Sequence, residues 1–277
     1  MEKLMTSALI PPEELHKILP RVKLLDASYN QPPSDAAIAG AVDFDIDDVA
    51  DPAAPLAHTV PSPEVFAAKV SALGIGNDDT VVVYDRAGIS MAASRAWWML
   101  RLYGHDNVRI LDGGLPAWVA AGYGFGPKNK TPAPKTFKAR FRPELLKYAG
   151  DVKTNIPRQA FTVLDARDAK RYAGEVPEPR PGMAPGHIPG SLSMPFMNFI
   201  DPATGRMKTV NELEKIIRSA HIDTTKPIAC SCGSGVTACV VALALHETGV
   251  KEAAVYDGSW AEWGANPALP KTTGKNP

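Results

Sequence analysis

The feature that most constrains the fold is an internal repeat that divides the chain into two similar halves. Val22–Ala27 resembles Phe161–Ala166, because each is an apolar run that ends in Leu-Asp-Ala. Ile38–Ala41 is echoed further along by Ile188–Ser191. A period of roughly 140–150 residues is too long for a solenoid of short repeats and indicates a duplicated domain. A chain of 277 residues also suits two domains of ordinary size better than a single core.

Further segments recur in the same order in both halves. Amphipathic stretches predict one helix in each half, and short apolar runs predict buried strands. The predicted helices are Ser62–Leu73 and Thr209–Ala220, and the predicted strands are Thr80–Tyr84, Val108–Leu111, Pro227–Cys230 and Ala253–Tyr256. Strands that alternate with helices are typical of parallel α/β sheets. We therefore expect an α/β protein with one mostly parallel sheet, flanked by helices, in each half.

A stretch rich in glycine and proline, Gly122–Lys135, separates the two halves. Such a composition is typical of a linker. We therefore predict an N-terminal domain over residues 1–122, a linker over residues 123–150 and a C-terminal domain over residues 151–277.

The second half carries an insertion. The offset between the halves is 139 residues at the first repeated motif (Val22 to Phe161) and 150 residues at the second (Ile38 to Ile188). The 11 additional residues fall within Arg167–His187, a stretch rich in arginine and proline. Because loops carry much of the binding function of proteins, we interpret this one as a substrate-binding loop.

Composition excludes several classes of function. Hydrophobic residues make up 45% of the chain, and 30 basic residues balance 30 acidic ones, so no global field favours nucleic acid or an anionic membrane. No run approaches the ~20 apolar residues that a membrane-spanning helix needs. The stretch Met1–Pro12 lacks the pattern of a signal or transit peptide. Three cysteines, an odd number, argue against a disulfide framework, so we expect a reducing cytoplasm.

Cys232 stands between a predicted strand and a predicted helix, in the segment Cys232-Gly-Ser-Gly-Val-Thr-Ala238. Two glycines let this loop curl so that the amides of Gly233–Thr237 converge on one centre. The partial positive charge of the helix N-terminus stabilises a thiolate there. The same cradle can hold a persulfide, so Cys232 is the predicted nucleophile.

The other cysteines suggest no separate chemistry. Cys230 lies inside the predicted strand and Cys239 about two turns into the predicted helix, and both are expected to be small buried residues. The spacing of Cys230 and Cys232 is not the usual Cys-x-x-Cys of a zinc site, and no second pair exists, so no metal is expected. A cysteine-dependent phosphatase would need an arginine six residues after the nucleophile, where this chain has Ala238.

The chain resembles the tandem rhodanese family over nearly its whole length, from Leu24–Ala27 to Tyr256–Trp260. Within that family it is most similar to the branch that takes sulfur from 3-mercaptopyruvate. The thiosulfate-using branch typically has two basic residues directly after the cysteine, where this chain has Gly233 and Ser234. The resemblance implies two tandem rhodanese-like domains and a sulfurtransferase that carries a persulfide on Cys232 without a cofactor.

The same resemblance implies that the first domain is non-catalytic. Aligning Gly88 with Gly235 places Asp85 opposite the predicted nucleophile. One departure from the family is Ala37–Gly40, which reads Ala-Ile-Ala-Gly where the family usually has His-Ile-Pro-Gly. We expect this change to affect the stiffness of the loop and not the chemistry.

The carboxylate of 3-mercaptopyruvate is a good partner for planar guanidinium groups. The resemblance implies that Arg171 and Arg180 bind it. The implied substrate-binding loop residues are Gly233, Gly235, Val236 and Thr237. From the residues alone, two arginines on a proline-rich loop could equally be solvated charges. Arg167, close to Asp165 at a predicted strand end, is interpreted as part of a structural ion pair.

Removal of sulfur from 3-mercaptopyruvate leaves a pyruvate enolate that must be stabilised and protonated. Ser234 is two residues from the nucleophile, so its hydroxyl can reach the ketone oxygen. The resemblance implies that His58 and Asp47 join it in a Ser–His–Asp relay across the domain interface. Without the resemblance, an exposed loop histidine is the more natural interpretation of His58.

Two competing functions remain open at this point. The first is a thiosulfate sulfurtransferase, which the missing basic residues after Cys232 disfavour. The second is a non-catalytic rhodanese-like binding module, which the intact cysteine loop disfavours. The expected partners are a small-molecule sulfur donor and a thiol, cyanide or thioredoxin-like acceptor, with no nucleic acid and no membrane.

Overall fold

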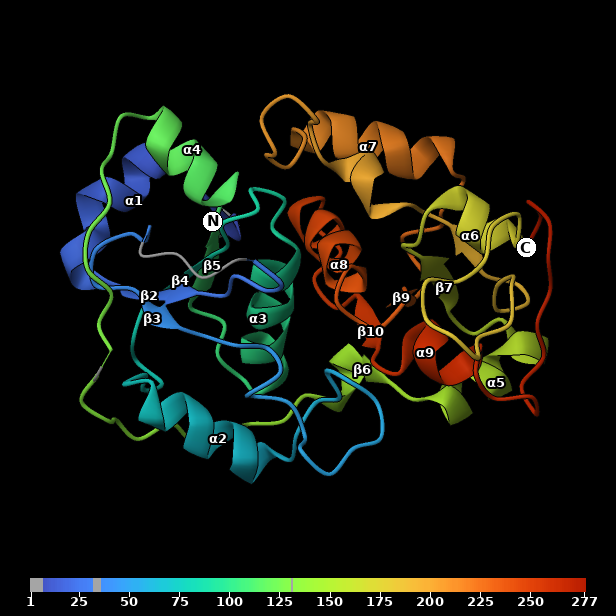
Figure 1. The fold of residues 1–277 in the computed structure, drawn as a ribbon. Helices are drawn as coiled ribbons and strands as arrows, with labels where there is room; N and C mark the ends of the chain where they lie inside the picture. Colours follow the sequence, from blue (N-terminus) through green and yellow to red (C-terminus); the bar gives the residue numbers. More distant parts are fainter. Residues whose placement is uncertain (1–6, 32–35, 131) are drawn as a thin grey trace. The chain divides into compact units, whose positions relative to one another are not determined.

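The computed structural model describes residues 7–31, 36–130 and 132–277. Residues 1–6, part of the stretch that lacks a signal-peptide pattern, and residue 131 of the predicted linker lie outside these ranges. The chain divides into two compact units (Figure 1). Unit 1 consists of Met1–Val49, Pro61–Phe141 and Asp201–Met207, and unit 2 of Ala50–Val60, Arg142–Ile200 and Lys208–Pro277.

Unit 1 contains a five-stranded parallel sheet with the strand order β1-β5-β4-β2-β3. Its strands are β1 (Leu9–Ile10), β2 (Lys23–Asp26), β3 (Val42–Asp43), β4 (Val81–Tyr84) and β5 (Val108–Leu111). Its helices are α1 (Pro12–Ile18), α2 (Pro63–Ala72), α3 (Met91–Leu102) and α4 (Gly114–Ala120), with a 3-10 turn at Leu19–Arg21. The central strand β4 is buried along its whole length, as its unbroken apolar run predicts.

Unit 2 repeats this topology with the strand order β6-β10-β9-β7-β8, again all parallel. Its strands are β6 (Leu146–Lys147), β7 (Thr162–Asp165), β8 (Leu192–Ser193), β9 (Ile228–Ser231) and β10 (Ala254–Tyr256). Its helices are α5 (Ala149–Arg158), α6 (Ala169–Ala173), α7 (Val210–Ser219), α8 (Ala238–Glu247) and α9 (Ser259–Trp263), with 3-10 turns at Pro143–Leu145 and Phe196–Phe199. The predicted α/β class and its parallel sheets are confirmed.

Local sequence explains where the two predicted helices begin. The Ser62 hydroxyl accepts a hydrogen bond from the Val65 amide, and Pro63 occupies the first position of α2. Helix α7 begins after Thr209, whose amide and hydroxyl both donate to the Glu212 carboxylate. This reciprocal capping arrangement satisfies amides that a helix start leaves without partners.

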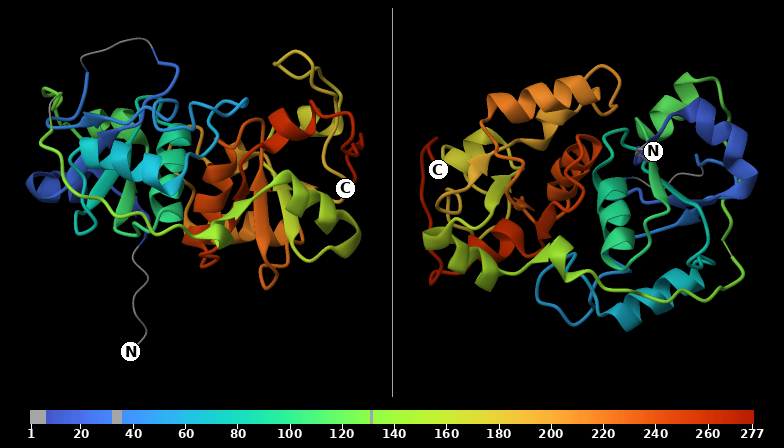
Figure 2. Two further views of the ribbon diagram at one scale, coloured as in Figure 1. Left: turned by 90° about the horizontal axis from the view of Figure 1, so that it is seen from below. Right: turned by 180° about the vertical axis from the view of Figure 1, so that it is seen from behind.

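Helices cover both faces of each sheet. In unit 1, residues of α1 and α4 pack with Leu24, Val82 and Tyr84, alternate positions that share one sheet face. Helices α2 and α3 lie on the opposite side of the strands (Figure 1), and α1 stays beside α4 when seen from behind (Figure 2). In unit 2, α5 and α9 share a core with β7 and β10, while α8 packs on β9 and β10. The two units therefore have the same layered architecture.

The insertion predicted in the second half contains helix α6. Between β2 and β3, the described residues of unit 1 include no counterpart of this helix. Asp168 caps α6 by accepting from the Lys170 amide, and Gly174 ends it in the left-handed conformation, with φ of 73°. The additional residues thus form an ordered element that carries Arg171.

Two short segments group with the unit that is built mainly from the other half of the chain. Ala50–Val60, from the first half, groups with unit 2, and Asp201–Met207, from the second half, groups with unit 1. The Val60 amide donates to Asp257 at 2.9 Å, and the Met207 amide donates to Asp112 at 2.9 Å. Each unit is therefore completed by a segment from the other half of the sequence.

The glycine- and proline-rich connection is hydrogen-bonded along unit 1. The Gly126 amide donates to the Ala37 carbonyl, and the Lys135 amide donates to the Ser71 carbonyl. Among the described residues, no helix is both long enough and apolar enough to cross a bilayer.

Candidate active site

Cys232 occupies the first position after β9, at the carboxyl-terminal edge of the unit 2 sheet. The side chain is buried, with 2% of the residue exposed, and it lines a cavity of about 350 Å³. The other residues around this cavity are Arg171, Pro179, Arg180, Met183, Gly233, Ser234, Val236 and Thr237. Parallel sheets present ligand sites at this edge, where strands end and loops begin. The structure thus brings most of the predicted site residues together around the predicted nucleophile.

The loop between β9 and α8 carries unused hydrogen-bond donors. Within the described chain, the amides of Gly233, Ser234, Val236 and Thr237 donate to no protein acceptor. Gly235 has a φ of 76°, a conformation that a side chain disfavours and that curls the loop. Amides in such a curl form a cradle for an anion.

Cys239 lies in the first turn of α8, not two turns into the helix as predicted. The helix begins only at Ala238, because the loop from Cys232 to Thr237 curls around the cradle before helical hydrogen bonding starts. The Cys239 thiol donates to the Gly235 carbonyl at 3.2 Å, so it contributes to the shape of the loop. Cys230 is fully buried within β9, and burial raises the pKa of its thiol well above the ordinary value.

Helix α9, which follows the neighbouring strand β10, is hydrogen-bonded to the cysteine loop. The Cys232 amide donates to the Ser259 hydroxyl at 3.1 Å, and the Cys232 carbonyl accepts from the Trp260 amide at 2.9 Å. Ser259 itself has a φ of 49°, in the left-handed region, which few residues other than glycine adopt. The sequence repeat marked Tyr256–Trp260 without indicating this role. These contacts hold both the amide and the carbonyl of the nucleophile.

Three arginines of the inserted segment have different environments. Arg171, on α6, and Arg180, on the following loop, both line the cavity of Cys232. Arg167 is completely buried and binds Asp165 through Nε at 3.0 Å and Nη2 at 2.6 Å. Burial acts to lower the pKa of Arg167, but Asp165 and Glu178 outweigh it and raise that pKa. The interpretation of Arg167 as a structural ion pair is confirmed.

Asp85 occupies the corresponding position of unit 1, directly after β4. It is buried, and its carboxylate accepts a hydrogen bond from the Gly88 amide at 3.2 Å. Burial raises the pKa of Asp85 to about 6, although hydrogen bonds from backbone amides oppose the shift. The segment Asp201–Met207 lies against this loop, since a Cβ atom on Gly205 would come within 2.5 Å of the Gly88 carbonyl oxygen. A carboxylate therefore occupies the cradle of unit 1, and a neighbouring segment packs against it.

The residues of the predicted proton relay belong to different units. His58 is buried within the segment grouped with unit 2, so the alternative of an exposed loop histidine is wrong. Two residues later, Val60 binds Asp257, which follows β10 directly as Cys232 follows the neighbouring strand β9. Asp47 is exposed and belongs to unit 1.

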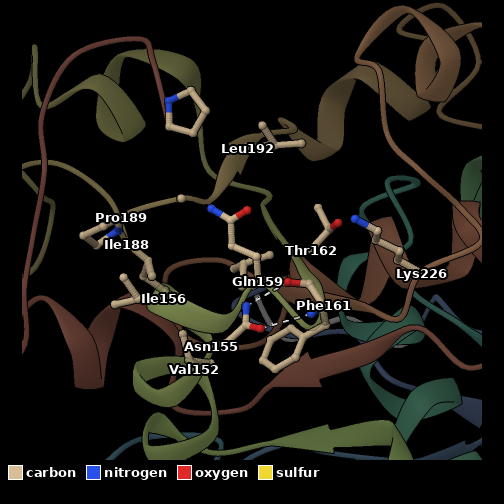
Figure 3. Close-up of a pocket in the computed structure, with 13 residues that line it drawn as sticks. Val152, Asn155, Ile156, Gln159, Phe161, Thr162, Ile188, Pro189, Leu192 and Lys226 are labelled. Carbon is tan, nitrogen blue, oxygen red and sulfur yellow. Dashed lines mark hydrogen bonds between the residues drawn. The ribbon is translucent and has the colours of Figure 1, made fainter.

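A second cavity, of about 370 Å³, lies in unit 2 at the beginning of β7 (Figure 3). The Asn155 amide group donates to and accepts from the Phe161 backbone, so its hydrogen-bonding groups are occupied. Among the described lining residues there is no cysteine and no arginine. The nucleophile and both candidate carboxylate-binding groups are instead in the cavity of Cys232.

Comparisons with known proteins show which family the chain is similar to. A model of the rhodanese-like domain matches residues 11–121 and 148–266. The thiosulfate/3-mercaptopyruvate sulfurtransferase 1, mitochondrial, of Arabidopsis thaliana is 40% identical over 281 residues, which cover 91% of this chain and 74% of that protein. The 3-mercaptopyruvate sulfurtransferase of Escherichia coli K12 is 39% identical over 261 residues, which cover 91% and 92%.

Among solved structures, SseA from Escherichia coli is similar along nearly the whole chain. That crystal structure is described as showing the rhodanese fold and catalytic mechanism of 3-mercaptopyruvate sulfotransferases. It superposes with a TM-score of 0.81 at 35% sequence identity, covering 92% of this chain and 99% of the other. The similarity includes both units.

Proposed function

Because this chain belongs to the rhodanese family, we propose that it is a sulfurtransferase that takes sulfur from 3-mercaptopyruvate and releases pyruvate. The sulfur passes through a persulfide on Cys232 to a thiophilic acceptor, such as a thiol or cyanide. The observation that carries the proposal is that Cys232 shares one cavity with Arg171 and Arg180. Unit 1, with Asp85 at the corresponding position, is proposed to be non-catalytic.

The first half-reaction loads the cysteine. The Cys232 thiolate attacks the donor sulfur, an S–S bond forms, and the C–S bond breaks with its electron pair left on carbon. The products are a persulfide and a pyruvate enolate, which takes up a proton to become pyruvate. Free loop amides support the step, because they can donate to the terminal sulfur of the persulfide. In the second half-reaction the acceptor attacks that sulfur and the thiolate is released.

In 3-mercaptopyruvate the carboxylate lies a few bonds from the sulfur. This separation suits a cavity that holds both the nucleophile and two guanidinium groups. The donor carboxylate is proposed to bind Arg171 and Arg180, while its sulfur meets Cys232. Ser234 lines the same cavity and is proposed to donate its hydroxyl to the ketone oxygen, where negative charge develops in the enolate.

His58 and Asp47 are proposed to complete a proton relay with Ser234. A His58→Gln variant is expected to lower kcat with 3-mercaptopyruvate by about 10²-fold, the usual contribution of a positioned acid or base. Thiosulfate releases sulfite and needs no enolate protonation, so any turnover of that donor should change less than about twofold. Steady-state kinetics with both donors would measure this difference, and Asp47→Asn should act in the same direction more weakly. Equal losses with both donors would assign buried His58 to folding instead.

The choice of donor gives the direct test of the proposed function. Thiosulfate is a compact dianion that needs positive charge close to the nucleophile, whereas the next two positions here are Gly233 and Ser234. We expect kcat/KM for 3-mercaptopyruvate to exceed that for thiosulfate by roughly 10²-fold, or about 3 kcal/mol in the transition state. Changing these two residues to Arg-Lys should narrow or invert the ratio, because it adds charge and removes the hydroxyl.

Paired kinetics with cyanide as the common acceptor would check this expectation, with thiocyanate and pyruvate as products. A wild-type preference for thiosulfate would refute the assignment in favour of a thiosulfate sulfurtransferase. Absence of turnover with both donors would favour the binding module. An unchanged ratio in the double variant would instead place the control of donor choice in Arg167–His187.

The physiological acceptor is proposed to be a small thiol or a thioredoxin-like dithiol, since either can attack a persulfide at its outer sulfur. A cytoplasmic location is proposed because three free cysteines suit a reducing compartment.

A further inference from the structure

Glu178 lies between the two cavity arginines in sequence, and its carboxylate is buried between two guanidinium groups. Oε2 accepts from Nη2 of Arg171 at 2.6 Å, and Oε1 accepts from Nη1 of Arg167 at 2.9 Å. The Glu178 side chain is only 1% exposed. A carboxylate this buried needs charged partners, and here it has two.

Arg167 is anchored to the framework of the cysteine loop. Besides Asp165, its guanidinium binds the Gly186 carbonyl and lies over the Trp260 ring, 4.3 Å from the ring centroid. Trp260 is the residue whose amide binds the Cys232 carbonyl. A continuous set of contacts therefore connects the nucleophile's backbone through Trp260 and Arg167 to Glu178.

Glu178 also binds Arg171 through two N–H groups of its guanidinium. Nε and Nη2 of Arg171 both face the carboxylate, at 3.3 and 2.6 Å. Nη2 also lies 3.3 Å from the point where a Cβ atom on Gly233 would stand, so the guanidinium lies next to the cysteine loop. Arginine has five N–H groups, so about three remain for a ligand once two are directed at Glu178. Arg180, by contrast, is exposed and has no ion pair or hydrogen bond within the described ranges.

We propose that Glu178 is a positioning residue that holds Arg171 in its donor-binding orientation before 3-mercaptopyruvate arrives. The inference rests on the proposed function. Two effects of the Glu178 charge oppose each other: it removes the entropic cost of ordering Arg171, but it repels the incoming carboxylate. We expect the positioning effect to dominate. Asp165 and Glu178 together balance the charges of Arg167 and Arg171, so the repulsion between Glu178 and the donor carboxylate is offset, and Arg180 supplies the additional positive charge that attracts the donor.

The test is a Glu178→Gln variant compared with Glu175→Gln. Glu175 lies on the same loop but is exposed, and among the described residues its carboxylate pairs only with Lys275, at 4.0 Å, so it is a matched control. We expect Glu178→Gln to raise KM for 3-mercaptopyruvate about tenfold or more with a much smaller change in kcat, because carboxylate binding is shared by ground and transition states. The control should behave as the wild type.

Two further readouts separate positioning from a general structural role. Discharge of the preformed persulfide to cyanide does not involve the donor carboxylate, so its single-turnover rate should be unchanged in Glu178→Gln. In an Arg171→Ala background, Glu178→Gln should alter KM less than about twofold, because the group that it positions is gone. A lower or unchanged KM in the single variant, or an equal effect without Arg171, would overturn the proposal.

If the Glu178→Gln variant does not fold, a Glu178→Asp variant provides the test. This variant keeps a negative charge between the two arginines but shortens the side chain by one methylene group, so it cannot reach both with the present geometry. The same rise in KM is expected, and a normal KM in the folded aspartate variant would overturn the inference. An inactive wild-type protein would refute the proposed function itself, which is a different outcome from an active wild type with a normal Glu178→Gln variant.

Discussion

Cys232→Ser is expected to abolish sulfur transfer, with a fall in kcat of at least about 10³-fold with any donor. A serine hydroxyl is not ionised at neutral pH and cannot carry the transferred sulfur as a persulfide. The loop itself should survive, because the contacts from Ser259 and Trp260 go to the main chain of residue 232. Circular dichroism and thermal melting of the variant would serve as the control for folding.

Mass spectrometry would locate the transferred sulfur. After treatment with 3-mercaptopyruvate and without acceptor, one additional sulfur, ~32 Da, is expected on the Cys232 peptide alone. Cys230 is sealed inside β9, where burial raises the pKa of its thiol and disfavours the reactive thiolate. The Cys239 thiol is also buried and is directed at the Gly235 carbonyl. A Cys232→Ser protein that still turned over, with sulfur on either of these residues, would contradict the assignment.

Arg171→Ala and Arg180→Ala are each expected to reduce kcat/KM for 3-mercaptopyruvate by about 2–5 kcal/mol in transition-state stabilisation. Each change would leave a bound carboxylate short of a charged partner in a cavity that also holds the nucleophile. Lysine should restore little at either position, because an ammonium lacks the planar fork of guanidinium. Steady-state kinetics on the four single variants would measure these effects.

Arg218 provides a matched control for the loss of an arginine. It lies on α7, is 69% exposed in its side chain and pairs only loosely with Glu214, at 3.7 Å. Arg218→Ala should leave kcat/KM unchanged, since exposed pairs of this kind contribute little. Near-normal kinetics in both Arg171→Ala and Arg180→Ala would show that neither guanidinium binds the donor, leaving Arg171 as the ion-pair partner of Glu178 and Arg180 as a solvated charge.

The central elements of the fold could be predicted because their sequence pattern is strong. Strands β4, β5, β9 and β10 are apolar runs followed by turn residues, and each lies within one residue of its predicted bounds. The edge strands could not be predicted in this way. Strands β1, β3, β6 and β8 contain two residues each, too few to show any alternation, and they exist because a longer neighbour supplies hydrogen bonds.

The candidate site was predictable as far as its residues are adjacent in sequence. The cysteine loop combines a strand end, two glycines and a helix start within a few residues, and these signals are local. The roles of Ser259 and Glu178 could not be predicted, because they depend on contacts made by folding. Ser259 binds the Cys232 amide 27 residues away, and Glu178 bridges two arginines. The only sequence signal for Glu178 was its position between Arg171 and Arg180.

The exchanged segments have a consequence for the order in which the protein acquires its structure during synthesis. A ribosome releases the chain from its N-terminus, and a domain usually folds once its last residue has emerged. Unit 1 still lacks Asp201–Met207 when Phe141 has been made, and Ala50–Val60 emerges before any strand of unit 2, the unit with which it groups. Completion of both units is therefore expected only late in translation. If the gene were divided at the linker, the N-terminal fragment would lack Asp201–Met207 and retain Ala50–Val60. The C-terminal fragment would lack Ala50–Val60 and retain Asp201–Met207.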